Sequence, residues 1–114
     1  MIAPRCKLWM SSPRTEGVFG DGKWRLLQAV DQHGSLSGAA DAMGMSYRKA
    51  WGDLKKAEKG LGVRLVERSR GGSEGGGTTV TEEGRRWIRA YTRYRAEVEK
   101  AIERAYRKHM APLL

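Results

Sequence analysis

The sequence has little of what catalysis and metal binding usually require. It contains one cysteine, Cys6, and two histidines, His33 and His109, which lie far apart. A single cysteine cannot form an internal disulfide, which indicates a reducing compartment. No metal-ligand spacing and no nucleophile signature accompanies these residues. We therefore expect no enzyme activity, no metal and no other cofactor.

Long hydrophobic runs are also missing. No apolar stretch reaches the roughly 18 to 20 residues that a membrane-spanning helix needs. The first ten residues lack the apolar segment of a signal peptide. We therefore expect a cytoplasmic protein that does not contact the membrane. With 114 residues, the chain has material for one hydrophobic core.

Acidic residues are few compared with basic ones. Twenty-two Lys and Arg against thirteen Asp and Glu give a net charge of +9, and most of this excess lies after residue 45. Such a balance points to a polyanionic partner such as nucleic acid, although a basic surface can serve solubility alone. The arrangement of the residues has to decide between these readings.

The first third of the chain predicts a small hairpin and a helix. Two short strand candidates, residues 7–10 and 17–20, are separated by a Ser-Ser-Pro-Arg sequence typical of a turn. Asp21 is placed to cap a helix, and Gly34 is placed to end it.

The next segment has the pattern of a helix-turn-helix. Residues 36–43 repeat apolar side chains at the i, i+3, i+4, i+7 spacing of one helical face. Gly44 interrupts this pattern, and Ser46 is placed to cap a second helix that extends to about Gly60. Two helices joined by a tight glycine turn are typical of this motif.

The last part predicts a β wing and a long helix. Strand candidates at residues 63–67 and 78–80 surround a glycine-rich loop at 71–77. Thr81 is placed to cap a helix that reaches His109. The expected fold is thus mainly α with a small β wing: a winged helix-turn-helix DNA-binding domain over residues 1–80, continued by a C-terminal dimerisation helix over residues 81–114.

The helix from Ser46 to Gly60 carries the predicted function. Its N-terminal residues are placed to read base edges in the major groove, and a basic stripe opposite its apolar face is placed on phosphates. An ordinary solvated face is the alternative, since Asp53 has the spacing to pair with Lys49. Trp51 is expected in the core, and for Tyr47 packing and phosphate contact are both open. The candidate DNA contacts on this helix are Ser46, Tyr47, Arg48, Lys49, Gly52, Lys55 and Lys59.

The glycine-rich loop is interpreted as the tip of a wing. It lacks the Gly-Lys-Ser or Gly-Lys-Thr ending of a nucleotide-binding loop. Small residues flanked by arginines suit close approach to the DNA backbone or minor groove, although a floppy surface loop remains an alternative. The candidate contacts of the wing are Arg64, Arg68, Arg70, Gly72 and Ser73.

The last helix has the heptad spacing of a dimerisation seam. At about 1.5 Å per residue it would be longer than one small domain needs. The alternative is that its first half packs on the chain's own core and the rest frays. The candidate dimerisation residues are Trp87, Tyr91, Tyr94, Val98, Ala101, Ile102 and Ala105.

These motifs resemble a known family. Gly34-Ser35-Leu36-Ser37 with Ala39-Ala40, the sequence from Gly44 to Trp51, Leu65-Val66-Glu67-Arg68 and the glycine-rich wing before Thr81 are similar to the N-terminal domain of the ModE family of molybdate-responsive transcription regulators. The winged helix-turn-helix of this family is of the LysR type. The resemblance covers about residues 20–107.

The resemblance implies a homodimeric transcription regulator that reads an inverted repeat in double-stranded DNA, within the nucleoid of a bacterial or archaeal cytoplasm. Members of the family carry molybdate-binding domains after the long helix, whereas this chain stops at Leu114. We therefore expect no molybdate site: either the protein regulates without a sensor of its own, or a separate sensor protein is a further partner. Two alternatives stay open: an adaptor that pairs with a longer molybdate-sensing relative through the last helix, and a nonspecific DNA binder.

Overall fold

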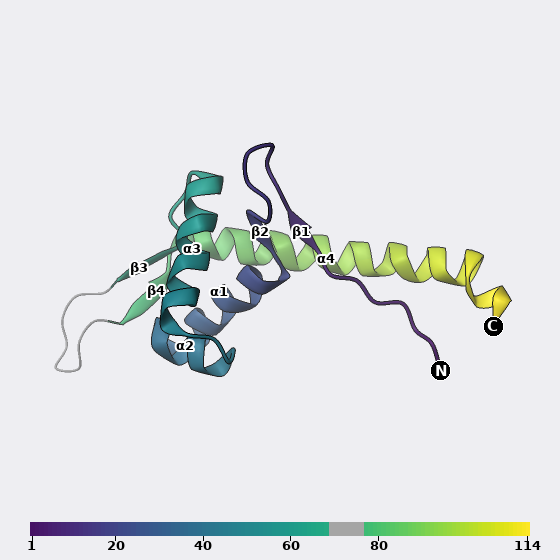
Figure 1. Ribbon diagram of the computed structural model, residues 1–114, viewed down its shortest axis with the longest axis horizontal. Coiled ribbons are helices and arrows are strands. Elements are labelled where there is room, and N and C mark those ends of the chain that lie inside the picture. The colour runs from purple at the N-terminus through teal and green to yellow at the C-terminus, as the bar shows by residue number, and fades with distance from the viewer. Residues whose placement is uncertain (69–76) are drawn as a thin grey trace.

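The computed structural model describes residues 1–68 and 77–114. Two short hairpins and three helices form a head, and a long fourth helix crosses this head and extends away from it (Figure 1). The principal dimensions are 60 × 32 × 23 Å. This architecture confirms the predicted fold, mainly α with a small β wing. The elements are β1 (Trp9–Met10), β2 (Phe19–Gly20), α1 (Asp21–His33), α2 (Leu36–Ala42), α3 (Tyr47–Leu61), β3 (Val66–Arg68), β4 (Thr78–Val80), α4 (Glu82–His109) and the 3₁₀ turn η1 (Ala111–Leu113).

The core lies where α1, α2 and α3 meet the wing strands and the start of α4. Small alanines on α2 and α3 let these two short helices approach closely, and leucines fill the remaining space. Apolar spacing predicted this set well, because each helix buries one face only. The core residues include Leu26, Leu27, Val30, Leu36, Ala39, Ala40, Ala50, Leu54, Ala57, Leu65, Val66 and Val80.

The turn between α2 and α3 is built as the sequence predicts. Gly44 adopts a φ of 67°, a left-handed conformation that favours glycine. The Ser46 hydroxyl accepts a hydrogen bond from the Lys49 amide at 3.0 Å, which confirms Ser46 as the cap of α3. Helix α2 ends at Ala42, one residue earlier than predicted, with Met43 as its C-cap.

One predicted cap is wrong. Gly20 is the N-cap of α1 and makes no side-chain cap bond, while Asp21 is the first residue of the helix. The Asp21 carboxylate instead accepts hydrogen bonds from the Leu8 amide, the Tyr91 hydroxyl and the Arg95 guanidinium. Tertiary donors therefore take the oxygen atoms that a local cap would have used.

The wing strands pair antiparallel, with Val66 opposite Val80. Strand β3 covers Val66–Arg68, rather than the predicted residues 63–67. The reason is Glu58 of α3, whose carboxylate accepts hydrogen bonds from the amides of Leu65 at 2.8 Å and Val66 at 3.3 Å. The backbone entering the wing is thus held by α3 and joins its partner strand later than the apolar pattern suggests.

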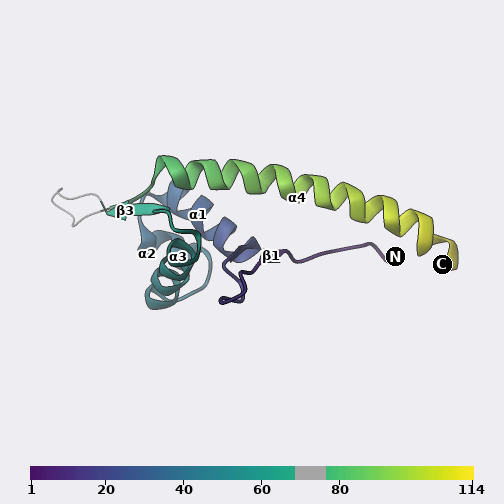
Figure 2. The same ribbon diagram turned by 90° about the horizontal axis from the view of Figure 1, so that it is seen from above.

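Helix α4 begins and ends where the sequence predicts. The Thr81 hydroxyl accepts a hydrogen bond from the Gly84 amide at 2.9 Å, and the helix runs to His109. Figure 2 shows its first turns over the head and its second half alongside the N-terminal segment. The Tyr106 hydroxyl donates to the carbonyl oxygen of Ile2 at 2.8 Å, which ties the two segments together.

The first half of α4 corrects part of the predicted seam. The rings of Trp87 and Tyr91 each lie 5.3 Å from the ring of Phe19, and Tyr91 is only 2% exposed. These two side chains complete the core of their own chain because β2 and α1 leave an apolar surface that needs a cover. Tyr91 is therefore covered by its own chain, whereas Trp87 is only partly buried.

Candidate DNA interface

Helix α3 has a buried side and an exposed basic side. Ala50, Leu54 and Ala57 face the core and are 0% exposed. On the opposite side, the basic stripe with Arg48 and Lys59 is exposed to solvent. The spacing of four and three between the buried residues follows from the 3.6-residue period of the helix. The structure thus gathers Arg48, Gly52, Lys55 and Lys59 on one open surface.

Ion pairs engage two of the candidate lysines. Lys49 Nζ lies 2.9 Å from Asp53 Oδ2, and Lys55 Nζ lies 3.3 Å from Glu58 Oε1. The Lys49–Asp53 pair lies at the surface, and exposed pairs of this kind contribute only about 0.2–1 kcal/mol. A phosphate group, with its full negative charge, can therefore compete for Lys49.

The flank of α3 next to the wing holds a cluster of aromatic and basic side chains. Arg68 of β3 donates from Nη2 to the Tyr47 hydroxyl at 2.8 Å. Its guanidinium carbon lies 4.6 Å from the centre of the Trp51 ring, and Lys55 Nζ lies 4.5 Å from that centre. Cation–π contacts of this kind stabilise a basic group without removing its charge. We call Tyr47, Trp51, Lys55 and Arg68 the wing cluster.

The wing cluster was not predicted as a unit. Trp51 is half-buried and packs against the core, as expected, but it also supports two cations. Tyr47 is 46% exposed, and its hydroxyl serves Arg68. The i, i+4 spacing of Tyr47, Trp51 and Lys55 was a usable signal, whereas the approach of Arg68 depends on the wing. Of the other wing candidates, Arg64 is exposed, and Arg70, Gly72 and Ser73 lie outside the described residues.

The second half of α4 carries the rest of the predicted seam. Tyr94 is 45% exposed, and Ala101 and Ala105 are also exposed. Val98 and Ile102 are half-buried. Beyond Tyr91, the apolar stripe of α4 is therefore largely uncovered by its own chain.

A buried polar network fixes the direction of α4. Arg95 Nε lies 2.9 Å from Asp21 Oδ1, and the Tyr91 hydroxyl donates to the same oxygen at 2.6 Å. Burial by itself would raise the pKa of Asp21, but the hydrogen bonds from Arg95, Tyr91 and the Leu8 amide outweigh it and lower the pKa to about 2. Burial and the nearby carboxylate raise the pKa of Tyr91. We call Asp21, Tyr91 and Arg95 the clamp.

Sequence reasoning missed the clamp because its members are 70 and 74 residues apart. Its groups are satisfied by one another, which indicates a structural role.

Among the described residues, no group of three His, Cys, Asp or Glu side chains is placed to hold a metal ion. None of the helices in this part of the chain is long and apolar enough to cross a membrane.

The sequence is similar to several molybdenum-related proteins. The molybdenum transport protein ModE of Azotobacter vinelandii is 36% identical over 105 residues, which are 91% of this chain and 39% of that protein. The molybdenum-pterin-binding protein MopB of Rhodobacter capsulatus is 34% identical over 98 residues, covering 86% of this chain and 36% of MopB. The chain spans well under half the length of these relatives. Its predicted resemblance to the ModE family is confirmed.

Solved structures share the fold at lower sequence identity. The DNA complex of the CbnR DNA-binding domain has a TM-score of 0.61 and 22% identity, covering 76% of this chain and 94% of that one. The BenM DNA-binding domain bound to the benA site 1 DNA has a TM-score of 0.58 and 21% identity, covering 79% and 96%. Residues 22–85 match the family described as bacterial regulatory helix-turn-helix protein, lysR family. The chain therefore belongs to the LysR family of bacterial regulatory helix-turn-helix proteins.

Proposed function

We propose that this chain is a sequence-specific DNA-binding transcription regulator that acts as a homodimer. The observation that carries the proposal is the open basic surface of α3, which lies directly opposite the buried face formed by Ala50, Leu54 and Ala57. A helix held in this way fits the major groove of B-form DNA. The DNA-bound neighbours named above, CbnR and BenM, share this fold.

The N-terminal turn of α3 is the proposed reader of bases. Ser46, Tyr47, Arg48 and Lys49 are all exposed at this end of the helix. Arg48 is the leading candidate, because arginine can donate two hydrogen bonds to guanine. Lys55 and Lys59 lie further along and are proposed to contact phosphates, which supply affinity but little sequence information.

The wing is proposed to lie on the DNA next to the groove that α3 enters. The wing cluster supports this arrangement, because the bond from Arg68 to Tyr47 joins β3 to the start of α3. The position of the wing is thereby coupled to the position of the reading helix. Arg68 keeps its charge while its side chain is held by Trp51, which lowers the entropy lost on binding a phosphate.

The uncovered half of α4 is the proposed dimer interface. Tyr94, Val98, Ala101 and Ala105 follow the four-and-three spacing that packs two helices together. A dimer would present two copies of α3 to DNA, spaced by about 34 Å or a multiple of it. The bound sequence would then be an inverted repeat.

The first experiment is a selection of bound duplexes from a random pool with the purified chain. An enriched inverted repeat is expected. Arg48→Ala should then weaken binding to the selected site by about 1–3 kcal/mol, with a smaller effect on unrelated duplexes. Lys100→Ala on the exposed side of α4 is the matched control, because it removes one positive charge away from α3. An unenriched pool would instead favour nonspecific DNA binding.

The dimer has its own test. Ala101→Glu with Ala105→Glu places like charges along the proposed seam, and sedimentation should show a monomer whose far-UV circular dichroism is unchanged. Glu97→Gln, on an exposed position of the same helix, should remain dimeric. A double variant that stays dimeric would refute this seam.

A second candidate function rests on the same uncovered stripe. The chain would pair through α4 with a longer relative, because an uncovered helix with heptad spacing can receive a second helix of the same spacing. The names of the matched relatives refer to molybdenum, but we propose that DNA binding by this chain needs no cofactor. Equal affinity for the selected duplex with and without added molybdate is expected.

A further inference from the structure

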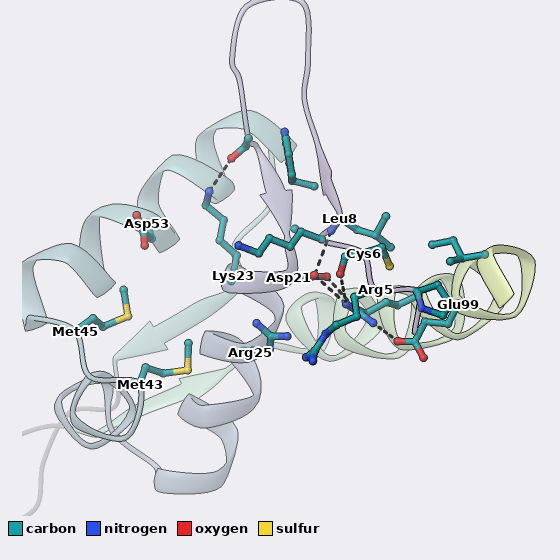
Figure 3. A pocket seen from close by; sticks show the side chains of 18 of the residues that line it. Arg5, Cys6, Leu8, Asp21, Lys23, Arg25, Met43, Met45, Asp53 and Glu99 are labelled. Atoms are coloured by element: carbon teal, nitrogen blue, oxygen red, sulfur yellow. Dashed lines mark hydrogen bonds and ion pairs between the residues drawn. The ribbon is translucent and has the colours of Figure 1, made fainter. Parts of the chain in front are cut away.

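The flank of α3 that faces away from the wing borders a large open cavity of about 1240 Å³. Its walls come from the N-terminal segment, the start of α1, the side of α3 that carries Lys49 and Asp53, and the part of α4 from Arg95 to Glu103. Figure 3 shows Lys23 and Arg25 on one side of this space and Met45 and Asp53 on the other. The cavity is thus a trough along α3, opposite the wing cluster.

The trough has more positive than negative charge available. Its carboxylates are already engaged: Asp53 pairs with Lys49, Asp21 and Glu99 pair with Arg95, and Glu103 pairs with Arg107. In contrast, no carboxylate of the described residues lies within salt-bridge distance of Lys7, Lys23 or Arg25, which also line the trough. Six cationic residues line the trough: Lys49 and Arg95 pair with carboxylates, whereas Arg5, Lys7, Lys23 and Arg25 have no such pair among the described residues.

The N-terminal hairpin and the start of α1 form the wall of the trough that faces α3, called the far wall below. A Cβ atom on Gly60 would lie 2.6 Å from Val18, so the hairpin packs directly on the end of α3. Lys23 Nζ donates to the carbonyl oxygen of Gly17 at 2.7 Å. Gly17 has a φ of 70°, which suits glycine in the turn. The far wall is therefore built before any ligand arrives.

The orientation of this wall matches that of the reading helix. Figure 2 shows the tip of the hairpin and α3 projecting to the same side of the head, away from α4. A duplex that receives α3 in its major groove has a phosphate backbone along each flank of the helix. The wing lies on one flank, and the trough lies on the other.

We propose that Lys7, Lys23 and Arg25 form a second phosphate-binding surface that holds the DNA backbone on the flank of α3 opposite the wing. This inference rests on the proposed function. Lys7 and the hairpin precede residues 22–85, the range that matches the LysR family, so this surface is partly an addition to the shared domain. DNA would thereby be held from both sides of the reading helix.

The electrostatics of Lys23 agree with this placement. Burial lowers its pKa, Asp53 raises it, and the neighbouring Lys56 and Lys49 lower it further. A phosphate group in the trough would relieve the repulsion among these lysines. It would also replace the hydration that Lys23 has already partly lost.

The test is a salt titration of DNA binding with the selected duplex. Lys7→Ala with Arg25→Ala removes two exposed cations of the trough. Each lost phosphate contact lowers the slope of log affinity against log salt by about 0.9, so the slope should fall by about 2 and affinity by roughly tenfold. The preferred sequence should not change, because phosphate contacts do not read bases.

The control is Lys100→Ala with Arg104→Ala, which removes the same charge from exposed positions of α4. Its slope should equal that of the unaltered chain. A hydroxyl-radical footprint of the unaltered chain gives a second readout: it should show backbone protection on both flanks of the major groove, and the trough variant should lose one flank.

An unchanged slope and footprint in the trough variant, with sequence preference intact, would overturn this inference and leave the proposed function standing. Equal slope losses in the trough variant and the control would also overturn it, because total charge alone would then explain the effect. If the unaltered chain bound no duplex, both the inference and the proposed function would fail.

Discussion

Replacing Asp21 by asparagine tests whether the clamp holds α4 on the head. Asp21 is 8% exposed, and its carboxylate accepts hydrogen bonds from Leu8, Tyr91 and Arg95. Asparagine has nearly the same shape but no charge, and its amide nitrogen would face donors. The Arg95 side chain, only 14% exposed, would keep its charge and lose its main partner.

The expected loss of stability is about 3 kcal/mol. Removing one partner of a buried ion pair typically costs about 3–5 kcal/mol. The lower end applies, because Arg95 retains its pair with Glu99 and its bond to the Cys6 carbonyl. For a domain of this size, a loss of about 3 kcal/mol corresponds to a fall in Tm of roughly 12 °C.

The pH dependence of unfolding gives an independent estimate of the stability that the Asp21 carboxylate contributes. Folding lowers the pKa of Asp21 from 3.8 to about 2, so the ionised carboxylate stabilises the folded state by about 2.5 kcal/mol at neutral pH. Because the folded pKa is the lower one, this contribution is complete above about pH 5 and is lost as the pH falls from 4 towards 2. Asparagine does not titrate, so the difference between the two proteins should shrink over that range.

Urea unfolding at pH 7 and at about pH 2.5, followed by tryptophan fluorescence, measures both quantities. Glu103→Gln is the control, since it breaks an exposed pair with Arg107 and should cost less than about 0.5 kcal/mol. A difference below about 1 kcal/mol at pH 7, or one that stays constant down to pH 2.5, would refute the role assigned to the clamp.

Three further substitutions follow from the packing. Gly84→Ala should destabilise the fold by about 1–3 kcal/mol in thermal unfolding, because its Cβ would lie 2.4 Å from the Leu65 carbonyl oxygen; an unaltered Tm would contradict this contact. Ser46→Ala should lower the free energy of unfolding by about 1 kcal/mol through loss of the α3 cap. Thermal unfolding followed by circular dichroism measures this loss, and an unchanged Tm would contradict it. Tyr47→Phe should leave Tm nearly unchanged but weaken DNA binding several-fold by releasing Arg68, so equal affinity would argue against coupling of wing and helix.

Local rules predicted much of the fold. Ser46 and Thr81 cap the helices that they precede, and Gly44 makes the turn, because capping and left-handed backbone depend on a few neighbouring atoms. The basic stripe on α3 was also readable, because the period of a helix fixes which residues share a face. Base contacts and the dimer seam remain predictions until they are measured.

Non-local contacts explain where the sequence-based predictions were wrong. Asp21 has the chemistry of a cap, yet donors about 70 residues away in sequence occupy its oxygen atoms. Heptad spacing marked Tyr91 as apolar and inward-facing, but the pattern could not say whether its own core or a second subunit would cover it.

The sequence by itself determined the helices, the N-caps of α3 and α4 and the basic face of α3, since these follow from side-chain spacing and bonds within one turn. Only the tertiary structure decided which side of α4 is covered, where Arg68 meets Tyr47 and how the hairpin borders α3. Those outcomes depend on which surfaces meet when the core closes. Burying apolar surface is favourable whichever surface it packs against, so the topology of the chain decides which surfaces pack together.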